Sequence, residues 1–119
     1  MELDRERAEE IFSTYLACHA RNDRAGVMAL FAADAAVEDP VGSPVHEGFG
    51  AIEAFYAGTH ERNGTMRIER VGALLVGGDE LTAHVRAALD APGAPPAMDV
   101  IYVIRVDVEG QILSLRAWY

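Results

Sequence analysis

The second half of the chain consists of four apolar segments separated by short turn sequences. The segments cover about residues 66–76, 80–90, 97–107 and 111–119, and glycine or proline interrupts each junction. In the segment 80–90, apolar and mostly polar residues alternate, which is typical of a strand with one covered face. Four such strands joined by tight turns predict an antiparallel sheet. The turn sequences are Gly77-Gly78-Asp79, Pro92-Gly93-Ala94-Pro95-Pro96 and Glu109-Gly110.

The first half of the chain shows helical periodicity instead. Residues 4–21 carry an apolar stripe behind a candidate N-cap, Asp4, and a second short pattern opens at Asp23 and runs to Phe31. A third pattern runs from Ile52 to about Gly58. Helices followed by antiparallel strands predict an α+β fold. A chain of 119 residues, half of them apolar, suits one domain over residues 1–119.

Charge and cysteine content exclude several classes of function. The formal net charge is −9, and binding a polyanion such as nucleic acid requires a basic surface, so we expect no nucleic-acid partner. The N-terminus lacks a secretory pattern and no apolar run approaches the ~18 residues of a membrane span, so we expect a soluble, cytoplasmic protein with no membrane contact. The single cysteine, Cys18, cannot form an intrachain disulfide.

Asp39 is the first candidate for chemistry. Residues 35–39 are predicted to form a strand that Pro40 ends, because proline cannot donate to a ladder and restricts the residue before it. Strand ends that lead into loops often display functional side chains. The alternative is a solvated turn aspartate, since Asp-Pro commonly opens turns.

Asp99 and Tyr15 are the other two candidates. Asp99 stands at the head of an apolar strand, where burial would raise the pKa of its carboxyl and leave it protonated as a hydrogen-bond donor. The alternative is that Asp99 faces solvent. Tyr15 lies on the apolar face of the first helix, where a buried hydroxyl needs a partner or a ligand, or where the ring serves ordinary core packing.

Other chemical motifs are weak, and we expect neither a metal nor a cofactor. The four histidines show no metal-ligand spacing, so zinc is not predicted. Gly48-Phe49-Gly50 lacks the third glycine of a dinucleotide-binding loop, because Glu53 occupies that place. The serines and Cys18 lie outside any nucleophile-elbow context.

Four segments taken together resemble the ketosteroid isomerase (steroid Δ5-isomerase) family, within the nuclear-transport-factor-2-like or SnoaL-like superfamily. They are Tyr15, Ala36-Val37-Glu38-Asp39-Pro40-Val41-Gly42, Ile52-Glu53-Ala54-Phe55-Tyr56 and Met98-Asp99-Val100-Ile101. The resemblance implies a cone-shaped fold in which three N-terminal helices pack on a strongly curved, mostly antiparallel sheet around an apolar pocket. It also implies a homodimer and a small ketosteroid substrate. The superfamily hosts many functions, so fold alone does not settle the reaction.

The resemblance further implies roles for the three candidates. Asp39 matches the general base that moves a proton from C4 to C6 of a 3-oxo-Δ5-steroid, and Tyr15 and a protonated Asp99 match the oxyanion hole. A carboxylic acid kept neutral as a donor is a known device of this enzyme family. The expected pocket or supporting residues are Phe31, Phe55, Tyr56, Val85, Met98, Val100, Leu115, Trp118 and Tyr119.

Some of these positions depart from the family pattern. Phe31 stands where one branch of the family has a tyrosine, Val85 where a pocket phenylalanine is common, and Tyr119 where a tryptophan is expected. Two other functions therefore stay open. One is a polyketide cyclase or hydratase with the same fold, and the other is a non-catalytic protein that binds a hydrophobic ligand.

Overall fold

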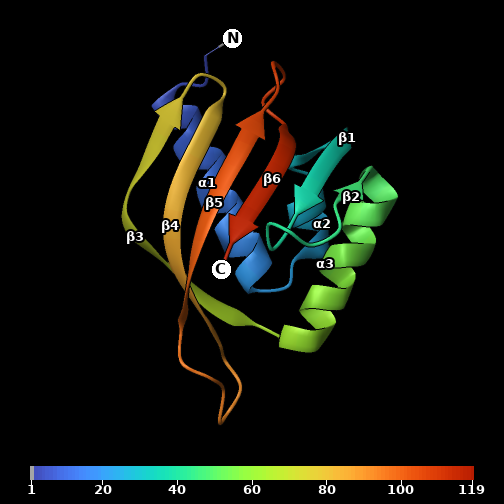
Figure 1. Ribbon diagram of the computed structural model, residues 1–119, viewed down its shortest axis with the longest axis vertical. Helices are drawn as coiled ribbons and strands as arrows, with labels where there is room; N and C mark the ends of the chain where they lie inside the picture. Colours follow the sequence, from blue (N-terminus) through green and yellow to red (C-terminus); the bar gives the residue numbers. More distant parts are fainter. Residues whose placement is uncertain (1) are drawn as a thin grey trace.

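The computed structural model describes residues 2–119, which form three helices and six strands (Figure 1). In chain order they are α1 (Arg5–Ala20), α2 (Arg24–Met28), β1 (Phe31–Glu38), β2 (His46–Glu47), α3 (Phe49–Asn63), β3 (Met66–Gly77), β4 (Glu80–Leu89), β5 (Met98–Val106) and β6 (Ile112–Trp118). The predicted α+β class and the four C-terminal strands are confirmed.

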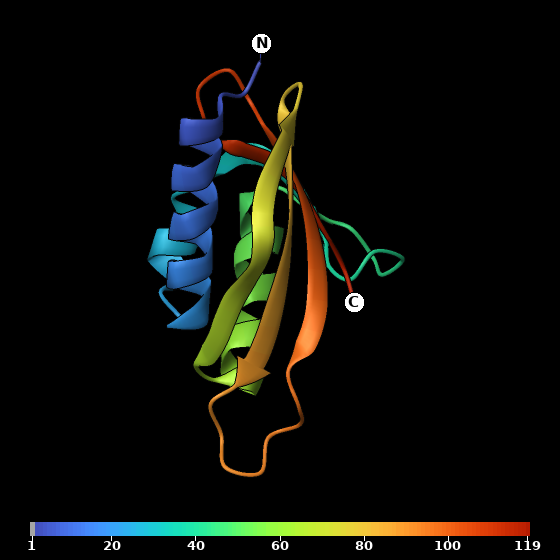
Figure 2. The same ribbon diagram turned by 90° about the vertical axis from the view of Figure 1, so that its left-hand side faces the viewer.

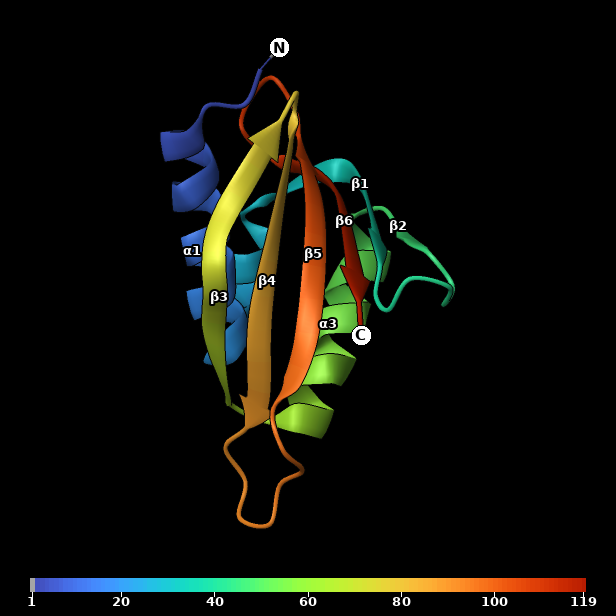
Figure 3. The same cartoon turned by 60° about the vertical axis from the view of Figure 1, so that its left-hand side comes forward.

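All six strands belong to one sheet, in the order β2-β1-β6-β5-β4-β3. Strands β1 and β6 pair in parallel, and the other neighbouring pairs are antiparallel. Helices α1 and α3 lie on the same side of the sheet (Figures 2 and 3). The sheet is therefore mixed, with its core between one sheet face and the helices.

The sheet bends around the helices. The register of β3 against β4 shifts between Val71 and Leu75, and Gly72 in this interval has a φ of 78°. Glycine adopts positive φ without the steric cost of a Cβ atom, and such bulges increase the local bend of a strand. The bulge therefore adds to the curvature of the sheet around the helices (Figures 2 and 3).

Helix α1 begins as the sequence predicts. The side chain of Asp4 accepts a hydrogen bond from the backbone N–H of Arg7, which satisfies one of the free donors at the helix start. The stripe expected to be apolar is the buried face, which packs against β3 and α2. It consists of Ala8, Ile11, Phe12, Tyr15, Leu16, Cys18 and His19.

Two predicted boundaries differ from the structure. Helix α2 ends at Met28 rather than near Phe31, and β1 begins at Phe31 instead of residue 35. Phe31 pairs with Ile112, and the N–H of Ile112 donates to the carbonyl of Leu30 at 2.7 Å. This long-range pairing with β6 places residues 31–34 in the sheet, although the local apolar spacing of this segment also suits a helix.

Within residues 2–119, no helix combines the length and apolarity that crossing a bilayer requires.

Candidate active site

A cavity of about 420 Å³ lies between α3 and the adjoining ends of β3, β4 and β5. Sites for small organic ligands commonly have volumes of ~300–1,000 Å³ and mostly apolar walls with a few polar groups. The lining here follows that description. The residues are His19, Asp39, Pro40, Phe55, Thr59, Arg62, Asn63, Met66, Ile68, Ala87, Ala88, Leu89, Pro95, Pro96, Met98, Val100, Tyr102 and Tyr119.

Asp39 is placed on the cavity wall by the pairing of β1 with β6. Glu38 is the last paired residue of β1, and the N–H of Val41 donates to the carbonyl of Ala117 at 2.7 Å. The hydroxyl of Tyr119 donates to Oδ1 of Asp39 at 2.6 Å. Burial raises the pKa of the Asp39 carboxyl, and the Tyr119 hydrogen bond and then the charge of His46 partly oppose this. A carboxylate of raised pKa in an apolar cavity is suited to taking a proton from carbon.

Tyr15 lies behind the cavity wall and is not part of it. Its hydroxyl lies 2.8 Å from the hydroxyl of Tyr56, and both side chains are fully buried. Burial raises the pKa of each phenol well above its usual value. The pair is therefore a neutral hydrogen-bonded unit inside the core.

Tyr102 stands between this pair and the cavity. It projects from β5 into the interior, its ring meets Tyr15 edge-on with centroids 5.6 Å apart, and it lines the cavity together with Asp39. Burial, and then the negative charge of Asp39, raises the pKa of the Tyr102 phenol, while the Tyr15 hydroxyl partly lowers it. Tyr102 is thus a neutral phenol that can donate a hydrogen bond, backed by Tyr15 and Tyr56.

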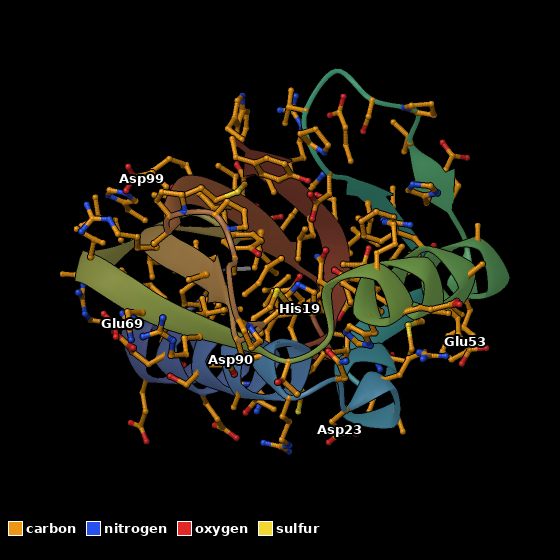
Figure 4. The ribbon with its side chains drawn as sticks, turned by 90° about the horizontal axis from the view of Figure 1, so that it is seen from below. His19, Asp23, Glu53, Glu69, Asp90 and Asp99 are labelled. Carbon is orange, nitrogen blue, oxygen red and sulfur yellow. The ribbon has the colours of Figure 1, made fainter. Side chains whose placement is uncertain are left out.

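Asp99 lies outside the cavity, which corrects the expectation of a buried, protonated carboxyl. Its side chain is 61% exposed, and its Oδ1 accepts hydrogen bonds from Nε2 of His84 at 2.7 Å and Nε of Arg86 at 3.2 Å. These partners, the His84 hydrogen bond first, lower the pKa of Asp99. Figure 4 shows Asp99 well away from His19, which lies in the interior. Asp99 is therefore an ionised residue of the outer sheet face.

The expected pocket residues fall into three groups. Phe55, Met98, Val100 and Tyr119 line the cavity. Phe31, Tyr56, Val85 and Leu115 are buried in the core behind it. Trp118 is partly exposed, with the guanidinium of Arg116 over its ring at 4.8 Å.

Tyr102 and His19 line the cavity but were not among the expected site residues. Tyr102 was missed because both faces of β5 are apolar in sequence, and only the structure shows that Tyr102 is buried while Asp99 and Ile101 are exposed. The signal for His19 was its place one helical turn after Tyr15 on the same face. Among residues 2–119, no group of three or more His, Cys, Asp or Glu side chains is arranged to hold a metal ion.

Comparison with known proteins identifies the family. A family model described as SnoaL-like domain matches residues 12–115. The chain belongs to the SnoaL-like family. This confirms the resemblance found in the sequence at the level of the family and its nuclear-transport-factor-2-like fold.

One relative and one structural neighbour of this SnoaL-like chain carry different names. A protein named steroid Delta-isomerase from Nocardioides simplex is 33% identical over 109 residues, which cover 88% of this chain and 83% of that protein. A crystal structure from Sinorhizobium meliloti, named "putative polyketide cyclase", superposes with a TM-score of 0.75 at 23% identity and covers 91% of this chain and 93% of its own. The second likeness concerns the fold alone.

Proposed function

We propose that this SnoaL-like protein is a steroid Δ-isomerase that converts 3-oxo-Δ5-steroids into 3-oxo-Δ4-steroids. The observation that carries the proposal is Asp39, a carboxyl with a raised pKa that shares an apolar cavity with the neutral phenol of Tyr102. The similarity to the protein named steroid Delta-isomerase supports the substrate class. The reaction needs a base and a hydrogen-bond donor, and both are side chains of this chain.

The reaction proceeds in two proton transfers. The Asp39 carboxylate takes a proton from C4, and the electrons of that C–H bond move toward the 3-oxo group to give a dienolate. The protonated Asp39 then returns the proton to C6, the C3 carbonyl reforms, and the double bond lies between C4 and C5. One carboxyl can serve both steps because C4 and C6 lie close together on one face of the fused rings.

The phenols stabilise the charge that develops on the C3 oxygen. Tyr102 donates to this oxygen, and Tyr15 and Tyr56 support it from behind through their hydroxyl pair at 2.8 Å. A donor fixed in an apolar site stabilises the dienolate more than the neutral ketone, so it lowers the barrier of the chemical step. In this proposal Tyr102 takes the role that the resemblance assigned to Asp99.

Tyr119 orients the base. Its hydroxyl occupies Oδ1 of Asp39 at 2.6 Å, which leaves Oδ2 to take the proton. The same hydrogen bond favours the ionised carboxylate and so counters part of the effect of burial. The Tyr119 hydrogen bond thereby favours the reactive, deprotonated form of the base.

The test is turnover of 5-androstene-3,17-dione, followed by the absorbance of the conjugated product, with wild type beside Asp39→Asn. Loss of the base is expected to lower turnover roughly 10²- to 10⁴-fold. Asp34→Asn is the matched control, because Asp34 is exposed on the same strand. Equal turnover by wild type and Asp39→Asn would contradict the proposal.

A second candidate function is a cyclase-type reaction on another carbonyl substrate. The observation that favours it is the polar part of the cavity wall, formed by His19, Arg62 and Asn63 beside the apolar residues. Under this alternative, well-folded wild-type protein leaves every 3-oxo-Δ5-steroid unchanged.

A further inference from the structure

Helices α1 and α3 each present a tyrosine and a histidine four residues apart, and the two pairs face one another. Tyr15 meets Tyr56 through their hydroxyls at 2.8 Å, and Nδ1 of His19 lies 3.2 Å from Nε2 of His60. The His19 ring also stacks on the Tyr15 ring, with centroids 5.5 Å apart and an interplanar angle of 28°. The proposed isomerase mechanism uses the tyrosines and leaves the histidines without a role.

His19 is the member of this histidine pair that reaches the cavity. It lines the cavity wall although only 7% of the residue is exposed, whereas His60 is 3% exposed and lies behind it. Nδ1 of His19 is occupied by His60, so Nε2 is the ring nitrogen left for a ligand. The fully buried side-chain atoms without a hydrogen-bond partner include Nδ1 of His60 but not Nε2 of His19. This agrees with a position of Nε2 at the cavity wall.

The tautomer of His19 follows from the environment of His60. Nδ1 of His60 is buried and has no hydrogen-bond partner among the described residues. If His19 donated to Nε2 of His60, then Nδ1 of neutral His60 would carry an unpaired buried N–H, a group that folded proteins rarely tolerate. If His60 donates instead, its Nδ1 is only an unused lone pair. His19 then accepts at Nδ1 and carries its own proton on Nε2.

Both rings are neutral at physiological pH. Burial, and then the neighbouring His60, lowers the pKa of His19 to about 4. Burial, and then the positive charge of Arg24, lowers the pKa of His60. A neutral N–H donor suits a neutral oxygen acceptor, because no charge has to be buried.

The donors His19 and Tyr102 both line the cavity, and both contact the Tyr15 ring, in different orientations. His19 stacks on the face of the Tyr15 ring, whereas Tyr102 meets that ring at an interplanar angle of 74°. We propose that His19 donates its Nε2–H to a second, neutral oxygen of the substrate, so that the preferred substrates carry a ketone or hydroxyl oxygen besides the reacting carbonyl. This inference rests on the proposed function for the identity of the reacting end.

The first measurement is independent of any ligand. Nitrogen-15 NMR of the histidine side chains in the free protein distinguishes a protonated from an unprotonated ring nitrogen. We expect His19 to be protonated at Nε2 and unprotonated at Nδ1 at pH 7. A proton on Nδ1 of His19 would overturn the inference, whether or not the protein acts on steroids.

The second measurement compares two non-reactive ligands, 5α-androstane-3,17-dione and 5α-androstan-3-one, which differ by one oxygen. Wild type is expected to bind the dione roughly 10-fold more tightly, and His19→Leu is expected to lose this preference, because a buried donor left unpaired weakens binding by about that factor. His19→Gln, which keeps an N–H donor, should retain part of the preference. His84→Leu is the control, since His84 lies on the outer sheet face beside Asp99.

The outcomes separate the two proposals. An equal preference for the dione in wild type and His19→Leu would overturn the role of His19, even if Asp39→Asn confirms the isomerase. A failure of both ligands to bind, together with no turnover of 5-androstene-3,17-dione, would refute the isomerase. The inference about a second substrate oxygen would then fall with it, and the tautomer measured in the free protein would decide only whether His19 offers a donor at Nε2.

Discussion

Replacement of Tyr102 by phenylalanine tests the position of the hydrogen-bond donor directly. The change removes one hydroxyl and keeps a ring that packs edge-on against Phe12 and Tyr15, with centroid distances of 5.8 and 5.6 Å. Because the packing is kept, we expect the free energy of unfolding to change by no more than about 1 kcal/mol. An effect on catalysis can therefore be separated from loss of folded protein.

The expected catalytic effect is larger than the effect on stability. Loss of one donor to a developing oxyanion lowers kcat by roughly 10²- to 10³-fold, or about 2.7–4 kcal/mol. The variant keeps the Asp39 base and the ring at position 102, so we expect the lower end of this range, about 10²-fold. KM should change little, since the interaction strengthens only as the charge develops.

The assay is steady-state turnover of 5-androstene-3,17-dione by wild type, Tyr102→Phe and Asp99→Asn, with thermal unfolding of each protein. Asp99→Asn should keep turnover within about 2-fold of wild type, because an exposed residue on the outer sheet face does not contact the cavity. A large loss in Asp99→Asn together with wild-type turnover in Tyr102→Phe would refute the assignment of donors.

Two further predictions concern the groups around the base and the donor. Tyr119→Phe removes a hydrogen bond that lowers the pKa of Asp39, so the pKa of Asp39 should rise. Because the base acts only when deprotonated, the acid limb of the kcat/KM profile should move to higher pH. A move to lower pH would contradict the role of Tyr119. Tyr15→Phe and Tyr56→Phe each leave one buried hydroxyl unpaired and should each lower the free energy of unfolding in urea by about 1–3 kcal/mol. The double variant should lose less unfolding free energy than the sum of the losses in the two single variants. Strict additivity of these losses would show that the two hydroxyls do not interact.

The position of Asp39 was predictable because its signal is local. The sequence of residues 35–39 and Pro40 together predict a strand that ends at this point, and β1 ends at Glu38, one residue before Asp39. Whether the carboxyl is buried depends on β6, a segment distant in the sequence. The raised pKa of Asp39 is therefore a property of the folded sheet.

The position of Asp99 was not predictable in the same way. Its strand is apolar on both faces, because Ile101 and Val103 occupy the outer face while Val100 and Tyr102 occupy the inner one. The alternation of side chains along the strand therefore does not indicate which face of β5 is exposed to solvent. The antiparallel pairing of Arg86 with Asp99 determines which face of the sheet carries the Asp99 side chain, and that register is a tertiary property of the sheet.

The histidine pair was missed for a related reason. His19 and His60 lie 41 residues apart, and each has only an ordinary helical neighbour, Tyr15 or Tyr56, in its own sequence context. The same tyrosine-to-histidine spacing in both helices was the available clue. Only the packing of α1 near α3 brings the two rings into contact.

The parallel pairing of β1 with β6 affects when the Asp39 carboxylate becomes more basic during folding. Glu38 and Arg116, which form an ion pair across these strands at 2.9 Å, are 78 residues apart. Contacts of such high sequence separation raise the contact order, and the loop entropy must be lost before they form. Until they form, Asp39 is an ordinary hydrated carboxylate with the reactivity of any surface aspartate. During refolding, the basicity of Asp39 should therefore appear together with the slowest, long-range step and not with the formation of the helices.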